Sequence, residues 1–314
     1  MQVTIDAILS GNRRALGRHL RGLDDRTEKA FATQRQLLAL GRRSRTIGVT
    51  GSPGVGKSTL TDRLIKSYRR DGERVAVIAV DPSSPFSGGA ILGDRIRMQG
   101  HHADPDTFVR SVATRGALGG LAASIRDMVD AVSAAGFGVV IIETVGVGQD
   151  EIDIVHLAQT NVVVELPGAG DGIQAIKAGL LEIADLFVVN KCDRPGAEQA
   201  VRQLSLLLDM EKKAQRAWAV PVLQTNALSG EGLESLRASI DDHQRYLDGA
   251  NGAARRRQDY LKAALREALR AAVNERVERL VENRDVETLE RLDSGALPYD
   301  VARDLLGQIL RNED

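Results

Sequence analysis

The hydrophobic residues of this chain follow three different patterns along its length. Up to about residue 44, leucines recur close to the helical period and charged residues fill the gaps between them. From about residue 45 to 246, short apolar runs alternate with longer helical patterns. Beyond that, apolar residues recur every four positions between arginines and glutamates. The pattern predicts an N-terminal helical extension (1–44), a central α/β domain (45–246) and a C-terminal helical arm (247–314).

The central domain is predicted to contain a doubly wound, mostly parallel β-sheet. Several of its apolar runs are apolar throughout, which is typical of parallel strands that helices cover on both faces. Strands that alternate with helices favour this α/β architecture. The predicted strands are 46–50, 75–80, 107–112, 139–143, 161–166, 186–190 and 220–225.

The C-terminal arm is predicted to begin with one long amphipathic helix. A second helix is expected from Tyr299 to Leu310, because the proline of Leu297-Pro298 ends a preceding helix and is tolerated where a new one begins. The apolar stripe of the long helix must be covered, either by the central domain or by a second subunit. We favour the second subunit and expect a homodimer. The stripe consists of Leu261, Leu265, Leu269, Val273 and Val277.

Composition and charge argue against several kinds of partner. The formal net charge is −1, so no strong field draws the chain to nucleic acid or to anionic lipid. Its single cysteine, Cys192, cannot form an internal disulfide, which fits a reducing compartment. The N-terminus lacks the pattern of a secretory signal, and no apolar run approaches the roughly 20 residues that span a bilayer. We expect a cytoplasmic protein with neither nucleic acid nor membrane as partner.

Residues 51–58 carry the clearest chemical signal of the sequence. They read Gly-Ser-Pro-Gly-Val-Gly-Lys-Ser, match G-x-x-x-x-G-K-[ST] in full, and lie between a predicted strand and a predicted helix. Glycines let backbone N–H groups turn toward a phosphate, and the helix N-terminus adds positive charge. Lys57 should reach the β- and γ-phosphates, and the Ser58 hydroxyl should bind Mg²⁺. The predicted phosphate contacts are Gly51, Ser52, Pro53, Gly54, Val55, Gly56, Lys57, Ser58 and Thr59.

Acidic residues follow two of the predicted strands. Asp81 and Glu143 should face the ligand crevice, because the carboxyl ends of strands beside such a loop do so. Glu143 has one methylene more than the usual Asp, which suggests contact with the metal through water or activation of water. Gly146 is a candidate N–H donor to the γ-phosphate. Asp94 either completes the metal shell or caps a helix. The predicted catalytic residues are Lys57, Glu143 and Asp94, and the predicted metal ligands are Ser58, Asp81, Asp94 and Glu143.

Residues 190–193, Asn-Lys-Cys-Asp, follow an apolar strand and predict recognition of guanine. Asp193 can accept hydrogen bonds from two guanine N–H groups at once, a pairing that adenine cannot offer. Lys191 should pack along the base, Asn190 should tie neighbouring loops together, and Ala227 is a candidate N–H donor to guanine O6. The predicted base contacts are Asn190, Lys191, Asp193, Asn226, Ala227 and Leu228. Together the motifs predict a P-loop GTPase that binds GTP or GDP.

Four more segments are too specific for ordinary loops, namely 82–95, 114–120, 143–149 and 167–171. With the two motifs, they resemble the MeaB/ArgK family of GTPases, which are chaperones of methylmalonyl-CoA mutase. The resemblance is dense from 47 to 232 and loose at both ends. Asn226 stands where relatives commonly carry serine, and Gly172 where they often carry an acidic residue.

The resemblance implies a GTPase that binds an adenosylcobalamin-dependent acyl-CoA mutase, with methylmalonyl-CoA mutase as the expected client. It implies that GTP binding and hydrolysis gate cofactor loading and protect the mutase. It also implies a homodimer formed through the C-terminal arm. Asp81, Asp94 and Glu143 correspond to the acidic metal-site positions of the family.

Two other functions fit part of the sequence. A P-loop kinase or ATPase linked to amino-acid transport would need an acceptor pocket and a catalytic base, and the Asn-Lys-Cys-Asp motif argues against it. A GTPase with a different metalloenzyme client would usually carry Cys/His clusters, whereas one cysteine and five histidines are scattered here. His101-His102 lacks a third ligand, so solvation in a loop is favoured over a metal site.

Overall fold

The computed structural model describes residues 5–81, 99–101, 103–113, 120–144, 157–168, 178–211, 218–249, single helical positions between 258 and 281, and 286–311. The chain divides into two compact units, Met1–Ala264 and Leu265–Asp314. Among the described residues, none of the helices has the length and apolarity of a membrane span.

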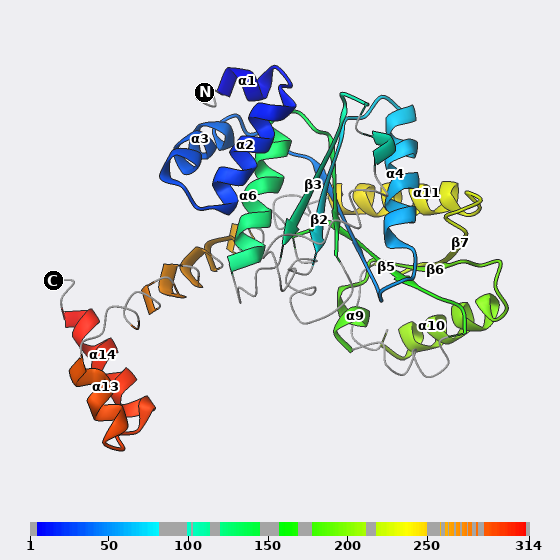
Figure 1. The fold of residues 1–314 in the computed structure, drawn as a ribbon. Coiled ribbons are helices and arrows are strands. Elements are labelled where there is room, and N and C mark those ends of the chain that lie inside the picture. Colours follow the sequence, from blue (N-terminus) through cyan, green and yellow to red (C-terminus); the bar gives the residue numbers. More distant parts are fainter. Residues whose placement is uncertain are drawn as a thin grey trace. The chain divides into compact units, whose positions relative to one another are not determined.

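A seven-stranded sheet forms the centre of the larger unit, and its strand order is β3-β2-β4-β1-β5-β6-β7 (Figure 1). Every pair of neighbouring strands is parallel, so the sheet is wholly parallel where the sequence predicted mostly parallel strands. All seven predicted strands are present, with ends within two residues of the predicted ones. They are β1 (Arg45–Thr50), β2 (Val75–Asp81), β3 (Thr107–Ala113), β4 (Val139–Glu143), β5 (Thr160–Glu165), β6 (Leu186–Asn190) and β7 (Val222–Thr225).

The strand order reverses around β1, which lies between β4 and β5. The register places Val49 beside Glu143 and Thr50 beside Val163, so the carboxyl ends of these three strands form one edge. Open parallel sheets bind ligands outside the carboxyl ends of their strands at such a reversal. The topology therefore points to the loop after β1 as the ligand site.

Helices cover both faces of the sheet (Figure 1). On one face, the buried leucines of the N-terminal helices join α6 and the side chains of β2 and β4 in one hydrophobic cluster. The helices of this layer are α1 (Ile5–Leu9), α2 (Arg13–Asp24), α3 (Glu28–Leu38) and α6 (Gly120–Ala134). Asn12 and Thr27 cap α2 and α3 by accepting from backbone N–H groups. The helical N-terminus thus shares its core with the sheet.

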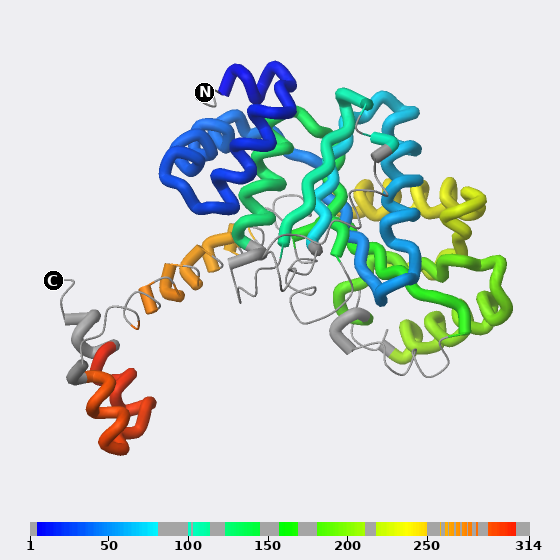
Figure 2. Tube along the Cα trace, in the orientation of Figure 1, coloured from blue at the N-terminus to red at the C-terminus, as the bar shows by residue number. Residues whose placement is uncertain are grey.

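The opposite face is covered by α4 (Lys57–Arg70) and α11 (Leu233–Asp248), which pack on β1, β4, β5 and β6. In Figure 2 the trace of α11 crosses that of α4, and residues of the two helices come close together. A third cluster joins α10 (Ala197–Glu211) to β6 and neighbouring strands. The short helices α9 (Ala178–Ile183) and η1 (Gln99–His101) complete the described part of this unit.

The smaller unit contains α13 (Val286–Asp293) and α14 (Pro298–Arg311). Helix α14 agrees with the predicted second helix of the arm. Helix α13 was not predicted, because its eight residues are too few to show a clear apolar period. The five stripe residues between Leu261 and Val277 are exposed in the single chain. What covers the stripe, and the division into three domains, stay predictions.

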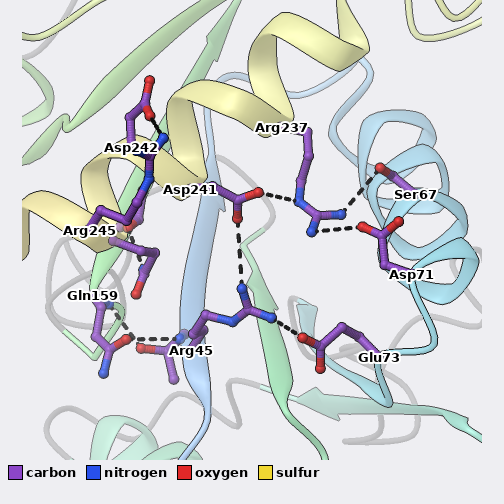
Figure 3. Close-up of polar contacts among 12 residues, drawn as sticks. Arg45, Ser67, Asp71, Glu73, Gln159, Arg237, Asp241, Asp242 and Arg245 are labelled. Carbon is purple, nitrogen blue, oxygen red and sulfur yellow. Dashed lines mark hydrogen bonds and ion pairs between the residues drawn. The ribbon is translucent and has the colours of Figure 1, made fainter. Parts of the chain in front are cut away.

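Arg237 joins α11 to α4 at the end of α4 that is far from the ligand edge (Figure 3). Its guanidinium lies 3.6 Å from the centroid of the buried Tyr68 ring, and it forms ion pairs with Asp71 at 3.0 Å and Asp241 at 2.9 Å. Arg45, at the start of β1, contacts the same Asp241 at 3.8 Å. This network ties α4, α11 and β1 together.

Replacing Arg237 with methionine should destabilise the fold, because the substitution removes both ion pairs and the stacking on Tyr68. We expect a loss of about 1–2 kcal/mol in the free energy of unfolding, measured by urea titration. Arg245→Met is the matched control on the same helix, since Arg245 is exposed and forms an ion pair with the exposed Asp242. Equal effects of the two substitutions would contradict a stabilising role for the network.

Candidate functional site

The loop between β1 and α4 depends on two glycines that approach other strands closely. Gly51 has a φ of 139°, and a Cβ there would clash with the Val164 carbonyl of β5. Gly56 has a φ of 100°, and a Cβ there would clash with the Asn190 side chain. Gly56 also precedes α4 without a side chain that could cap it, so the first-turn N–H groups face the loop. This is the backbone geometry of an anion site.

Lys57 and Ser58 begin α4 and are both buried at the loop. The Lys57 ammonium donates to the carbonyls of Gly51 at 2.6 Å and Ser52 at 3.0 Å. The Ser58 hydroxyl donates to Glu143 Oε1 at 2.6 Å, at the end of β4. The structure thus brings the predicted metal ligands Ser58 and Glu143 together, next to Lys57, which was predicted to reach the phosphates.

The Ser58 hydroxyl and the Glu143 carboxylate form a set of hard oxygen ligands suited to Mg²⁺. Asp81 ends β2, the strand next to β4, but its side chain lies outside the described residues. Asp94 and Gly146 lie outside them altogether. Within the described parts of the chain, no group of three acidic, His or Cys side chains could hold a metal. The donor pair fits the metal, and its remaining ligands stay predictions.

Asn190 connects the phosphate loop to the loop after β7. Its Nδ2 donates to the Val55 carbonyl at 2.8 Å, and its Oδ1 accepts from Thr225 Oγ1 and from the Ala227 N–H, both at 3.1 Å. These contacts agree with the expectation that Asn190 ties neighbouring loops. Lys191 has a φ of 59° and extends its ammonium to the Gly54 carbonyl at 2.8 Å.

The Ala227 N–H, the candidate donor to guanine O6, already has an acceptor in this structure, and its contact with guanine stays a prediction. It donates to Asn190 Oδ1, so a hydrogen bond to a base would have to share or replace that contact. The exposed Leu228 donates its own N–H to Asn226 Oδ1 at 3.0 Å.

Asn226 holds the carboxylate that was predicted to read guanine. Its Nδ2 donates to Asp193 Oδ1 at 2.9 Å, while its Oδ1 accepts from the Leu228 and Ser229 N–H groups at 3.0 and 3.3 Å. A serine hydroxyl could not reach in both directions with separate donor and acceptor atoms. The asparagine at this position both shapes the loop and orients Asp193.

Two buried side chains differ from what the sequence indicated. His101 is buried, and its Nε2 lies 2.7 Å from Asp62 Oδ1, so the prediction of a solvated loop histidine was wrong. Glu165 was missed: it ends β5 next to the phosphate loop and is 7% exposed. A carboxylate that ends an apolar strand was the same signal that identified Glu143. Burial raises the pKa of Glu165 to about 7, against the opposing charge of Lys57.

The raised pKa makes Glu165 a source of pH-dependent stability. The folded state binds a proton between the ordinary pKa of 4.5 and the folded pKa of about 7, so this stability is lost as the pH rises through that range. Glu165→Gln should therefore gain up to about 3 kcal/mol over the wild type at pH 8, and little at pH 5. Urea unfolding at both pH values measures the difference.

The exposed Glu234, in the first turn of α11, provides the control, since Glu234→Gln removes a surface carboxylate and should not reproduce the gain at pH 8. A Glu165→Gln difference that does not change with pH would contradict the titration of this carboxyl group.

Comparison with known proteins adds independent findings. Residues 21–283 match the family described as methylmalonyl Co-A mutase-associated GTPase MeaB. A protein of Pyrococcus horikoshii, provisionally named a GTPase, is 42% identical over 309 residues, which are 98% of this chain and 97% of that protein. A fused isobutyryl-CoA mutase of Cupriavidus metallidurans is 36% identical over 230 residues, which are 71% of this chain and 21% of the mutase.

Among solved structures, the chain is similar to the LAO/AO transport system kinase. The TM-score is 0.70 at 28% identity, and the superposition covers 98% of this chain and 96% of the other. The matched part of the chain includes the seven-stranded parallel sheet and its helices. The fold is therefore that of a P-loop protein. Since the family match takes in most of the sequence and both nucleotide motifs, the chain belongs to the MeaB family of P-loop GTPases.

Proposed function

We propose that this GTPase is a chaperone of an adenosylcobalamin-dependent acyl-CoA mutase, with methylmalonyl-CoA mutase as its client. GTP binding and hydrolysis would gate cofactor loading and protect the mutase from inactivation. One observation carries the proposal: the fused isobutyryl-CoA mutase contains a segment 36% identical to 71% of this chain. Fusion into one chain keeps the GTPase module and the mutase module at a high effective concentration. A GTPase on a separate chain would instead need a surface that binds the mutase.

The proposed nucleotide site follows from the contacts of the described residues. The phosphates lie in the 51–58 loop against the N-terminus of α4, and Lys57 exchanges its two carbonyl contacts for phosphate oxygens. Ser58 and Glu143 would hold Mg²⁺, with Asp81 and Asp94 as further ligands, and the bound metal would supply positive charge beside the γ-phosphate. Glu143, which is 4% exposed, would contact the metal through water or activate the attacking water.

The base lies between Lys191 and the loop after β7. Asp193 accepts from guanine N1–H and the exocyclic amine, and the Asn226 amide fixes the carboxylate for that purpose. We further propose that the nucleotide state reaches the client through the segments 82–95, 144–152 and 168–180. Each segment follows the carboxyl end of β2, β4 or β5, which are neighbours in the sheet or flank β1.

We also propose a homodimer formed through the C-terminal arm. The five stripe residues are each at least 41% exposed in the single chain, and Val281 continues the spacing at 67%. Burying apolar side chains of this size against a second copy supplies a large share of the free energy of association. Residues spaced four positions apart lie along one face of a helix, so the stripe fits packing against a second helix along its length.

A kinase function is the second candidate, because the LAO/AO transport system kinase has the same fold at a TM-score of 0.70. A kinase would transfer the γ-phosphoryl group to an acceptor rather than to water. Transfer of label from γ-³²P-GTP or γ-³²P-ATP to an amino-acid or protein acceptor would favour it. Release of inorganic phosphate alone favours the GTPase chaperone.

Asp193→Asn should change the base specificity of the site. Calorimetry with Mg-GDP should show a loss of about 100-fold or more in affinity, because an amide nitrogen cannot accept from guanine. The variant should gain affinity for Mg-XDP, since its amide can donate to the C2 oxygen of xanthine. Mg-ADP should bind the wild type at least about 100-fold more weakly than Mg-GDP.

Asp242→Asn, an exposed change on α11, should leave all three affinities unchanged. Comparable wild-type affinity for ADP and GDP would contradict guanine recognition at Asp193, and would bring the kinase or ATPase alternative forward.

The client is tested with purified methylmalonyl-CoA mutase. We expect a complex whose affinity differs at least about fivefold between GDP and a non-hydrolysable GTP analogue, the range of ordinary coupling energies. The mutase should also lose activity more slowly during turnover when the GTPase and GTP are present. Isobutyryl-CoA mutase is the parallel client. Absence of nucleotide-dependent binding to both mutases would contradict the chaperone role.

A further inference from the structure

Arg63 connects the helix that begins with the phosphate-binding residues to the loop that follows β7. It lies in the second turn of α4 and is half-buried. Its Nε donates to the Ala227 carbonyl at 2.9 Å, and its Nη2 donates to the Leu228 carbonyl. We call residues 226–232 the base loop. The guanidinium is permanently charged and planar, so it can hold two neighbouring carbonyls in one fixed orientation.

These contacts complete a set of hydrogen bonds that fixes the base loop. The peptide group between Ala227 and Leu228 is held at both ends: its carbonyl accepts from Arg63, and its N–H donates to Asn226 Oδ1. The preceding N–H, on Ala227, donates to Asn190 Oδ1. Within the base loop, Asn226 and Glu231 also form a backbone bridge. Arg63 is the member of this set that comes from the phosphate-binding helix.

The same set leads to the carboxylate that reads the base. Asn226, whose Oδ1 accepts from the Leu228 N–H, donates from Nδ2 to Asp193 Oδ1 at 2.9 Å. A shift of the Ala227–Leu228 peptide therefore moves the N–H donor from which Asn226 Oδ1 accepts, and a displaced Asn226 in turn shifts Asp193. Arg63 thus adds a second connection, besides Asn190, between the phosphate-binding part of the site and the loop that holds Asp193.

We propose that Arg63 is a positioning residue for guanine recognition, which acts through the base loop on Asn226 and Asp193 without touching the phosphates. The inference rests on the proposed base site and adds a determinant of its selectivity. If Arg63 contributed to fold stability alone, its substitution would lower the affinity for every ligand by a similar factor. A positioning role weakens the guanine contacts and spares the phosphate contacts, and this difference is measurable.

The test compares Arg63→Met, Arg63→Lys and the control Arg70→Met, which changes an exposed arginine in the last turn of the same helix. Calorimetry measures the affinities for Mg-GDP, Mg-ADP and Mg-pyrophosphate, the last as a probe of the phosphate loop alone. For Arg63→Met we expect the GDP-to-ADP affinity ratio to fall about tenfold, as for loss of charged hydrogen bonds. Pyrophosphate affinity should stay within about twofold of wild type.

The GDP-to-ADP affinity ratio of Arg63→Lys should lie between those of the wild type and Arg63→Met, because one ammonium cannot reproduce the planar contact with two carbonyls. Arg70→Met should match the wild type for all three ligands. Equal losses for GDP and pyrophosphate, or an unchanged ratio in both Arg63 variants, would overturn the inference. A wild type without preference for GDP would overturn the proposed base site and this inference together, whereas a selective wild type with unaffected variants overturns this inference alone.

Discussion

The Asn190 side chain donates to the Val55 carbonyl and accepts from Thr225 and Ala227, and it is 2% exposed. Leaving a buried amide group unpaired costs about 1–3 kcal/mol, so the loops that satisfy it are held in one arrangement. Gly56 belongs to the same constraint, since a side chain there would displace the amide. The phosphate loop and the base loop are therefore parts of one site, although more than 100 residues separate them in the chain.

The rest of the larger unit supports this arrangement by fixing α4. At its beginning, Ser58 meets Glu143 of β4, and Arg63 holds the base loop. At its far end, Tyr68 and Asp71 receive Arg237 from α11. Helix α11 itself begins directly after the base loop, at Leu233. These contacts hold α4, α11, the end of β4 and the base loop in fixed positions. Such support keeps the nucleotide-binding groups of a MeaB-family GTPase within hydrogen-bond distance of their ligand.

Most of the fold followed from the sequence, because apolar runs of parallel strands and the consensus 51–58 are local signals. The failures share a physical origin in long-range packing. Arg63 and Ala227 are 164 positions apart, so no local pattern announces their contact. His101 was predicted to be a solvated loop residue, because its contact with Asp62 is not visible in the local sequence. Burial by elements distant in the chain raises the pKa of Glu165.

The central claim is that one guanine nucleotide bridges the 51–58 loop and Asp193 in a frame held by Asn190. A crystal structure with Mg-GDP tests it most directly. The account predicts the β-phosphate within hydrogen-bond distance of the backbone N–H groups before α4, and guanine N1 and N2 within hydrogen-bond distance of the Asp193 carboxylate. It also predicts that the Asn190 bond to Val55 persists. A base that lies away from Asp193, or an Asn190 side chain detached from the phosphate loop, would contradict the account.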